Sequence, residues 1–516
     1  MKKNKKSYLQ KMGRQAGVSL HITSLPGPHG IGDIADSAMG FLDQLVEMDL
    51  GVWQILPSGP TAYGDSPYQP LSAFAGNPMF VGLGPLLRKK LVKASELEPL
   101  ESLPHDHVDY GRLIPAKQAI LNVAAERFIS EPQHGLAAEF EDFQQRYGKR
   151  WLDDYALFRV LKSLHGERPW PEWNEKYIRR DPVALEKLRN EHRADIEKIK
   201  VIQFLFDHQW NKLRARAEDK GICLFGDMPI YIALDSSDAW AHPKRLLLNG
   251  DGLPSFIAGV PPDYFSEDGQ LWGNPLYDWP YHKKTGYRWW IERIQHAANQ
   301  TPLVRIDHFR GFESYWSVPS DSSTAREGRW ETGPGDGLFL AMQKIMGSLP
   351  IVAEDLGVIT PEVVRLRENH GLPGMVVLQF EVGNPEFDFN SVSENSVCYT
   401  GTHDNDTTLG WFFGNGADTR TPEEISEQQA SALERTGGTA ETVAQDMIRL
   451  ALSSNSCLAV VPMQDYLGLG SEARLNVPGT TMNNWRWRVQ SHQLQPALLE
   501  SVRALVDSTG RSNRSK

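Results

Sequence analysis

Carboxylates stand at the ends of several apolar runs in this sequence, and their neighbours suit acid and base chemistry. In the run 303–307, Arg305 precedes Asp307 by two residues, so on a strand both side chains lie on one face. A guanidinium beside a carboxylate favours its ionised form, which an attacking group needs. On this stretch alone, a structural ion pair at a strand end explains the pattern equally well.

Two further carboxylates extend the pattern. Glu354 follows the apolar residues 351–353, where partial burial would raise its pKa and suit it to giving and taking a proton. Asp404 stands beside His403, where it would hydrogen-bond hydroxyl groups and stabilise a developing positive charge. No metal-ligand set accompanies these residues, so neither a metal nor a cofactor is predicted. The set fits cleavage of a glycosidic bond, in which one carboxylate attacks and another handles the proton.

The elements that must position these carboxylates alternate along the chain. Apolar runs typical of buried parallel strands recur with amphipathic helices between most of them, at 17–22, 52–57, 222–227, 303–307, 351–355, 375–380, 396–401 and 458–462. Eight such units predict an α/β fold, a (β/α)8 TIM barrel, whose reactive groups lie at the carboxyl ends of the strands. Asp227, Asp307, Glu354 and Asp404 would then converge on one mouth.

Longer stretches between these runs predict insertions in a single catalytic barrel domain, 17–516. Residues 58–200 are expected to form a mainly helical subdomain after the second strand, and 228–285 an active-site loop subdomain after the third. The loop 259–265, with two prolines and two aromatic residues, is a candidate cover for the mouth. Residues 1–16 and 509–516 are expected to be flexible termini.

Composition narrows the partners. The chain has 516 residues and a net charge of -11, from 54 basic and 65 acidic side chains, which argues against nucleic acid as a partner. Three sparse cysteines build no disulfide framework, and no apolar signal core or membrane-length run occurs. We therefore expect a cytoplasmic protein without a membrane partner, as a monomer or weak homo-oligomer.

Longer motifs add a resemblance to a known family. Arg305-x-Asp307, Glu354-Asp355 and His403-Asp404, in this order, resemble the short regions shared by the α-amylase clan. Further segments resemble the 4-α-glucanotransferases called amylomaltase or disproportionating enzyme, glycoside hydrolase family 77, and they are 64–69, 72–78, 226–231, 259–265, 270–275 and 464–479. The segment after Asp227 lacks the Asn-His pair usual in the wider clan. This difference argues against an ordinary amylase and against the calcium site of that clan.

The resemblance implies a retaining transfer between α-1,4-glucans (maltodextrins). A donor would be cleaved, its glycosyl part held on Asp307, with Glu354 as acid and base, and passed to the 4-hydroxyl of an acceptor glucan. The residues it implies at the sugar subsites are Arg305, His403, Tyr68, Ser66, Trp272, Gln270 and Asn476. Tyr63 would belong to a secondary glucan groove, and Asp227 is either substrate-binding or structural.

Two other functions remain open at this point. An α-1,4-glucan hydrolase would use the same carboxylates and differ only on the acceptor side. A non-catalytic glucan-binding protein would be expected to have lost at least one of Asp307, Glu354 and Asp404, and all three are present.

Overall fold

Eight parallel strands form the main sheet of the computed structural model, which describes residues 6–131, 135–262, 267–414 and 419–512. In their spatial order they are β10 (Gly374–Val377), β11 (Ser396–Tyr399), β12 (Leu458–Pro462), β1 (Gln15–Ser19), β2 (Val52–Gln54), β3 (Cys223–Pro229), β6 (Leu303–Asp307) and β9 (Ile351–Ala353). Between β9 and β10, the backbone N–H of Ala353 donates to the carbonyl of Pro373 at 2.8 Å. The sheet is therefore a barrel, and the predicted (β/α)8 fold is confirmed.

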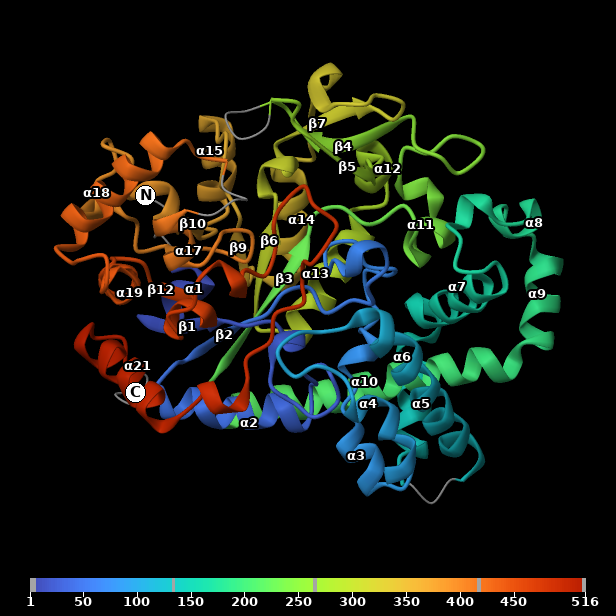
Figure 1. Ribbon diagram of the computed structural model, residues 1–516. Helices are drawn as coiled ribbons and strands as arrows, with labels where there is room; N and C mark the ends of the chain where they lie inside the picture. The colour runs from blue at the N-terminus through green and yellow to red at the C-terminus, as the bar shows by residue number, and fades with distance from the viewer. Residues whose placement is uncertain (1–5, 132–134, 263–266, 415–418, 513–516) are drawn as a thin grey trace.

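Helices surround this barrel (Figure 1). Those near the strands are α2 (Asp36–Glu47), α10 (Arg193–Asp219), α13 (Arg288–Gln300), α14 (Asp336–Met346), α15 (Pro361–Asn369), α16 (Leu378–Glu381), α17 (Thr408–Phe413), α18 (Pro422–Thr436), α19 (Val443–Ser453), α20 (Met463–Tyr466) and α21 (Pro496–Ser508). In α2 the buried residues Phe41, Leu42 and Leu45 recur at helical spacing, so one face packs on the barrel. α18 begins with a capping box between Thr421 and Glu424.

A helical segment follows β2 on one side of the barrel (Figure 1). It contains α3 (Leu83–Arg88), α4 (Glu98–Glu101), α5 (Tyr110–Ser130), α6 (Ala137–Tyr147), α7 (Asp153–Leu164), α8 (Glu175–Ile178) and α9 (Pro182–Glu191), and α10 leads back to β3. The side chain of Gln203 in α10 bonds both the N–H and the carbonyl of Gly76, each at 2.9 Å. A Cβ on Gly76 would lie 2.2 Å from the Phe206 ring, so only glycine permits this approach. The helix thereby fixes the loop that begins the segment.

A second sheet of four antiparallel strands stands beside the barrel mouth. It has the order β5 (Gln270–Pro275), β4 (Phe256–Val260), β7 (Ser314–Pro319), β8 (Arg329–Thr332). Two short helices, α11 (Ser237–Ala241) and α12 (Trp279–Lys284), flank the first pair of strands in sequence. The sequence predicted an inserted subdomain only in the segment 228–285 after β3, whereas β7 and β8 come from the loop after β6. The sheet therefore ties together two loops that belong to neighbouring barrel strands.

The termini expected to be flexible, 1–16 and 509–516, make defined contacts in the parts that the structure describes. Helix α1 (Tyr8–Met12) starts at a capping box formed by Ser7 and Gln10, and its fully buried Leu9 packs among the first residues of barrel strands such as Val52 and Leu303. α1 thus closes the amino end of the barrel. At the other end of the chain, Arg511 is fully buried.

Arg511 is held by backbone carbonyls on both sides of the β12–β1 pair. Its guanidinium donates to the carbonyls of Gln15, Ser454 and Ser456, among others. The polar composition around residue 511 suggested a flexible end. The sequence could not reveal these contacts, because the carbonyls lie far from residue 511 along the chain. In the part of the chain that the structure describes, no helix is long and apolar enough to span a lipid bilayer.

Candidate active site

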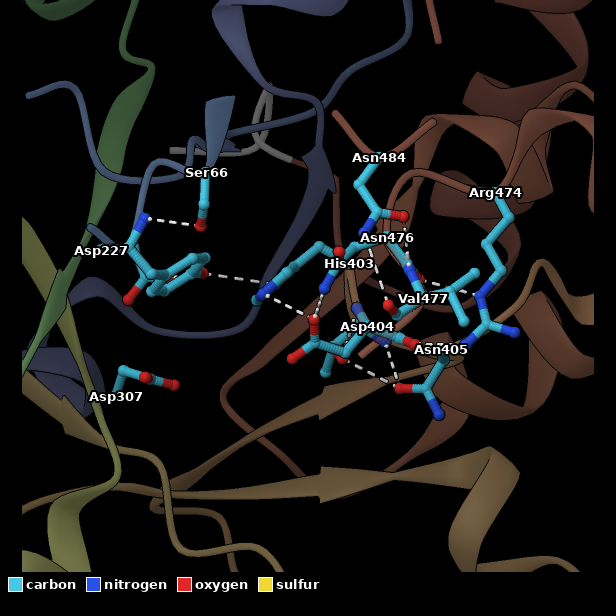
Figure 2. A network of polar contacts seen from close by, with 12 residues as sticks. Ser66, Asp227, Asp307, His403, Asp404, Asn405, Arg474, Asn476, Val477 and Asn484 are labelled. Atoms are coloured by element: carbon cyan, nitrogen blue, oxygen red, sulfur yellow. Dashed lines mark hydrogen bonds and ion pairs between the residues drawn. The ribbon is translucent and has the colours of Figure 1, made fainter. Parts of the chain in front are cut away.

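The predicted carboxylates lie at one end of the barrel, and Figure 2 shows three of them, Asp227, Asp307 and Asp404. Asp307 is the last residue of β6, Glu354 directly follows β9, and Asp404 lies in the loop after β11. Asp227 lies within β3, paired in register with Arg305 of β6. Parallel strands bring their carboxyl ends to one edge, so the four side chains share one mouth.

Arg305 connects two of these carboxylates. One of its terminal nitrogens donates to Asp227 Oδ2 at 2.7 Å and the other to Asp307 Oδ1 at 2.8 Å. The side chains of Arg305 and Asp227 are 5% and 0% exposed, whereas that of Asp307 is 31% exposed, so only Asp307 faces the open mouth. Burial raises the pKa of the Asp307 carboxyl, and the neighbouring Arg305 guanidinium opposes this rise. The sequence argument had included the effect of Arg305 but not that of burial.

Glu354 lies against the backbone next to Asp307. Its Oε2 accepts from the N–H of His308 at 2.7 Å, and its Oε1 from the N–H of Leu356 at 2.9 Å. Burial raises the pKa of Glu354 to about 7, with Asp307 adding to the rise and Arg305 opposing it. The direction agrees with the sequence argument. A carboxyl with this pKa is protonated for part of the time near neutral pH.

His308 turns the chain just after Asp307. It has a φ of 55°, in the left-handed region that non-glycine residues seldom occupy. Its ring packs edge-on against Trp272 at 4.7 Å between ring centres, and burial lowers its pKa to about 3. His308 therefore packs as a neutral ring, and its backbone N–H donates to Glu354.

Asp404 is held from two sides. Asn476 Nδ2 donates to Asp404 Oδ1 at 2.6 Å, and His403 Nε2 lies 3.3 Å from the same oxygen (Figure 2). The Asp404 side chain remains 45% exposed. Its contacts thus orient the carboxylate without closing it off from the mouth.

The entry loop adds Tyr68 and Ser66. Tyr68 Oη donates to Asp227 Oδ2 at 2.7 Å, and its ring stacks on His403 with 5.0 Å between ring centres. Ser66 Oγ accepts from the Tyr68 N–H at 3.3 Å, so Ser66 supports the turn that presents Tyr68. Asp227 is thus bonded by both Tyr68 and Arg305, which connects β3 to the entry loop and to β6.

The second sheet contributes Trp272 and Gln270. Trp272 Nε1 donates to the side-chain oxygen of Gln270 at 3.1 Å, and its half-buried ring reaches His308. Gln69 binds Asn274 of the same strand at 3.0 Å, which ties the entry loop to β5. Tyr63 begins the turn Tyr63–Asp65, and its side chain lies outside the described residues. Residues 263–265 of the predicted cover also lie outside them.

Sequence reasoning gave no role to Asp465, which anchors the loop of His403 and Asp404. Its Oδ2 accepts from the hydroxyls of Thr400 and Thr408 at 2.6 and 2.8 Å, and its Oδ1 accepts from the Thr408 N–H at 2.7 Å. The two threonines flank the loop on both sides. Asp465 was noticed only as part of a motif, because its partners lie more than fifty residues away.

Trp485 packs against Tyr68 and His403, at 5.9 Å between ring centres in each case. Across the described ranges, no group of three or more His, Cys, Asp or Glu side chains is arranged to hold a metal ion.

Comparisons with known proteins agree with one another. Residues 20–494 match the family model described as 4-alpha-glucanotransferase. A 4-alpha-glucanotransferase of Thermus thermophilus is 45% identical over 96% of this chain and 99% of its own length, and one of Synechocystis is 43% identical over 96% and 98%. A solved amylomaltase of Streptococcus agalactiae, in complex with acarbose, superposes with a TM-score of 0.91 at 36% identity and covers 97% of this chain and all of its own.

Proposed function

The chain belongs to the 4-alpha-glucanotransferase family and is an enzyme of that class, and on this premise we propose how its residues carry out the transfer. In the first step, the Asp307 carboxylate attacks the anomeric carbon of an α-1,4-linked donor. Glu354 gives its proton to the departing glycosidic oxygen, and the cleaved part leaves with a free 4-hydroxyl. The glycosyl group remains as an ester on Asp307.

In the second step, the ionised Glu354 takes the proton from the 4-hydroxyl of an acceptor glucan. That oxygen attacks the anomeric carbon and releases Asp307, so the configuration is retained. The observation that carries this proposal is the bond from the His308 N–H to Glu354 at 2.7 Å. This hydrogen bond places Glu354, whose pKa is raised, next to Asp307, because Asp307 immediately precedes His308. Asp307 is in turn paired with Arg305.

The remaining residues take the sugar-binding roles. Asp404, oriented by Asn476 and His403, would bind sugar hydroxyls and stabilise the positive charge that develops on the ring. Trp272 and Tyr68 offer ring faces at the mouth, as sugar-binding sites commonly do, and Ser66 and Gln270 support them. The Streptococcus agalactiae amylomaltase was solved in complex with acarbose, which supports a sugar-like ligand for this chain.

Incubation of the purified protein with maltotriose tests the activity. We expect glucose together with a ladder of longer maltodextrins, because an acceptor glucan replaces water at the intermediate. Glucose and maltose with nothing longer would overturn the proposal in favour of hydrolysis.

The covalent step has its own test. Asp307→Asn should lower kcat by at least about a thousandfold, because a neutral amide cannot attack, while maltotriose still binds. Glu354→Gln incubated with α-maltotriosyl fluoride should yield a glycosylated peptide that contains Asp307, since fluoride leaves without a proton donor. Mass spectrometry of the digested protein would locate the ester. Label on another residue, or an active Asp307→Asn, would refute the assignment.

A further inference from the structure

Arg474 joins the two residues whose side chains pair at the mouth. Its Nε donates to the backbone carbonyl of Asn476 at 2.8 Å, and one of its terminal nitrogens donates to the backbone carbonyl of Asp404, also at 2.8 Å (Figure 2). The side chains of Asn476 and Asp404 meet at 2.6 Å. One planar guanidinium thus spans the main chains of both partners of this hydrogen bond.

The backbone that carries Arg474 is itself fixed to the same loop. Arg474 follows the turn Ser471–Ala473, where Ser471 Oγ donates to Asp406 Oδ2 at 2.7 Å. Gln464 donates to the carbonyl of Ala473 at 3.3 Å. The backbone segment that carries Arg474 is therefore hydrogen-bonded to the loop that contains Asp404.

We propose that Arg474 is a positioning residue that sets the orientation of the Asp404 carboxylate toward the sugar. A guanidinium is planar and its donors have fixed spacing, so bridging two carbonyls fixes their separation in a way that a lysine ammonium cannot. In the described part of the chain no carboxylate forms an ion pair with Arg474, and this points to geometry as its contribution. The proposal rests on the role given above to Asp404.

A cavity borders Arg474. It has a volume of about 480 Å³, and its lining includes Arg474, Arg486 and Trp487 together with the exposed residues Glu472 and Asn483. These exposed residues leave it open to solvent. A small cation in solution can therefore reach the place of the Arg474 guanidinium if that side chain is removed.

The test is truncation followed by chemical rescue. Arg474→Ala should lower kcat for maltotriose disproportionation by about a hundredfold with little change in KM. The reason is that a misoriented Asp404 carboxylate stabilises the transition state less, while substrate binding changes little. Millimolar guanidinium should restore a measurable part of the lost kcat. Arg474→Lys keeps the charge without the bridge, so its kcat should stay low.

Arg486→Ala is the matched control. Arg486 lines the same cavity, but it contacts the carbonyl of Val108 and the side chain of Asn483 instead of Asp404. Its kcat should stay within about twofold of the wild type, with no response to guanidinium.

The outcomes separate this inference from the proposed function. An inactive wild-type protein would refute the proposed function, and a fully active Asp404→Asn variant would refute the role of Asp404. A folded Arg474→Ala protein with normal kcat, or with a loss that guanidinium does not relieve at an unchanged melting temperature, would overturn the inference alone. If Arg474→Ala does not fold, the kcat of Arg474→Lys decides, because normal activity there contradicts a bridging role.

Discussion

Individual residues in this mouth obtain their chemistry from partners that are distant in sequence. Arg305 and Asp307 could be recognised as a pair because they lie two residues apart on one strand. The contact of Tyr68 with Asp227 joins segments that are 159 residues apart, and no local pattern announces it. The type of each reactive residue is thus readable from sequence, whereas its protonation depends on neighbours that only the fold brings together.

Glu354 leads to a prediction about pH. Its pKa is raised to about 7, and the first step needs its protonated form, so kcat/KM for maltotriose should fall as the pH rises through about 7. At low pH, protonation of Asp307 should produce a second decline. A pH series of initial rates measures both limbs.

A change of donor isolates the upper limb. With α-maltotriosyl fluoride as donor and formation of the intermediate as the readout, no proton is needed for departure, so the decline above pH 7 should vanish. If it persists at the same pH, another group must be responsible.

At the scale of elements, buried and strongly periodic segments were predictable and short or amphipathic ones were not. Each of the eight apolar runs proposed from sequence overlaps a barrel strand, because parallel strands are apolar on both faces. β7 and β8 went unnoticed because strands of a half-exposed sheet mix polar and aromatic residues. α1 has only five residues, and its stability comes from the barrel end that it covers.

This explanation of α1 predicts the effect of truncating its buried side chain. Leu9→Ala should lower the free energy of unfolding by about 2–5 kcal/mol, because it opens a cavity among the strand ends. The kcat should be unchanged, since the mouth lies at the opposite end of the barrel. Urea unfolding and maltotriose turnover measure the two quantities.

Lys11→Ala provides the control within the same helix, because Lys11 is exposed. It should change the free energy of unfolding by less than about 0.5 kcal/mol. Equal effects of the two substitutions would argue against α1 as the cover of the barrel end.

The whole molecule depends on joining its first and last barrel strands. β1 pairs with β12 over Gln15–Ser19, and Arg511 donates to carbonyls on both sides of that pair. Arg511→Ala should therefore lower the free energy of unfolding by at least about 3 kcal/mol, because several buried carbonyls lose a charged donor.

Arg503→Ala in α21 is the comparison, since the Arg503 side chain is 43% exposed. Denaturant unfolding of both variants measures the difference. Similar stabilities would mean that the β12–β1 pair does not need the Arg511 bridge.

The pairing of β1 with β12 also constrains how the protein can be made. On the ribosome, β1 emerges early, and its edge toward β12 stays without a neighbour until nearly the whole barrel has been translated. Open strand edges invite pairing with other chains, so the nascent polypeptide passes through a long period in which it benefits from chaperones. Barrel closure is therefore a late event in biosynthesis, and translation that stops before residue 458 leaves a product that cannot close.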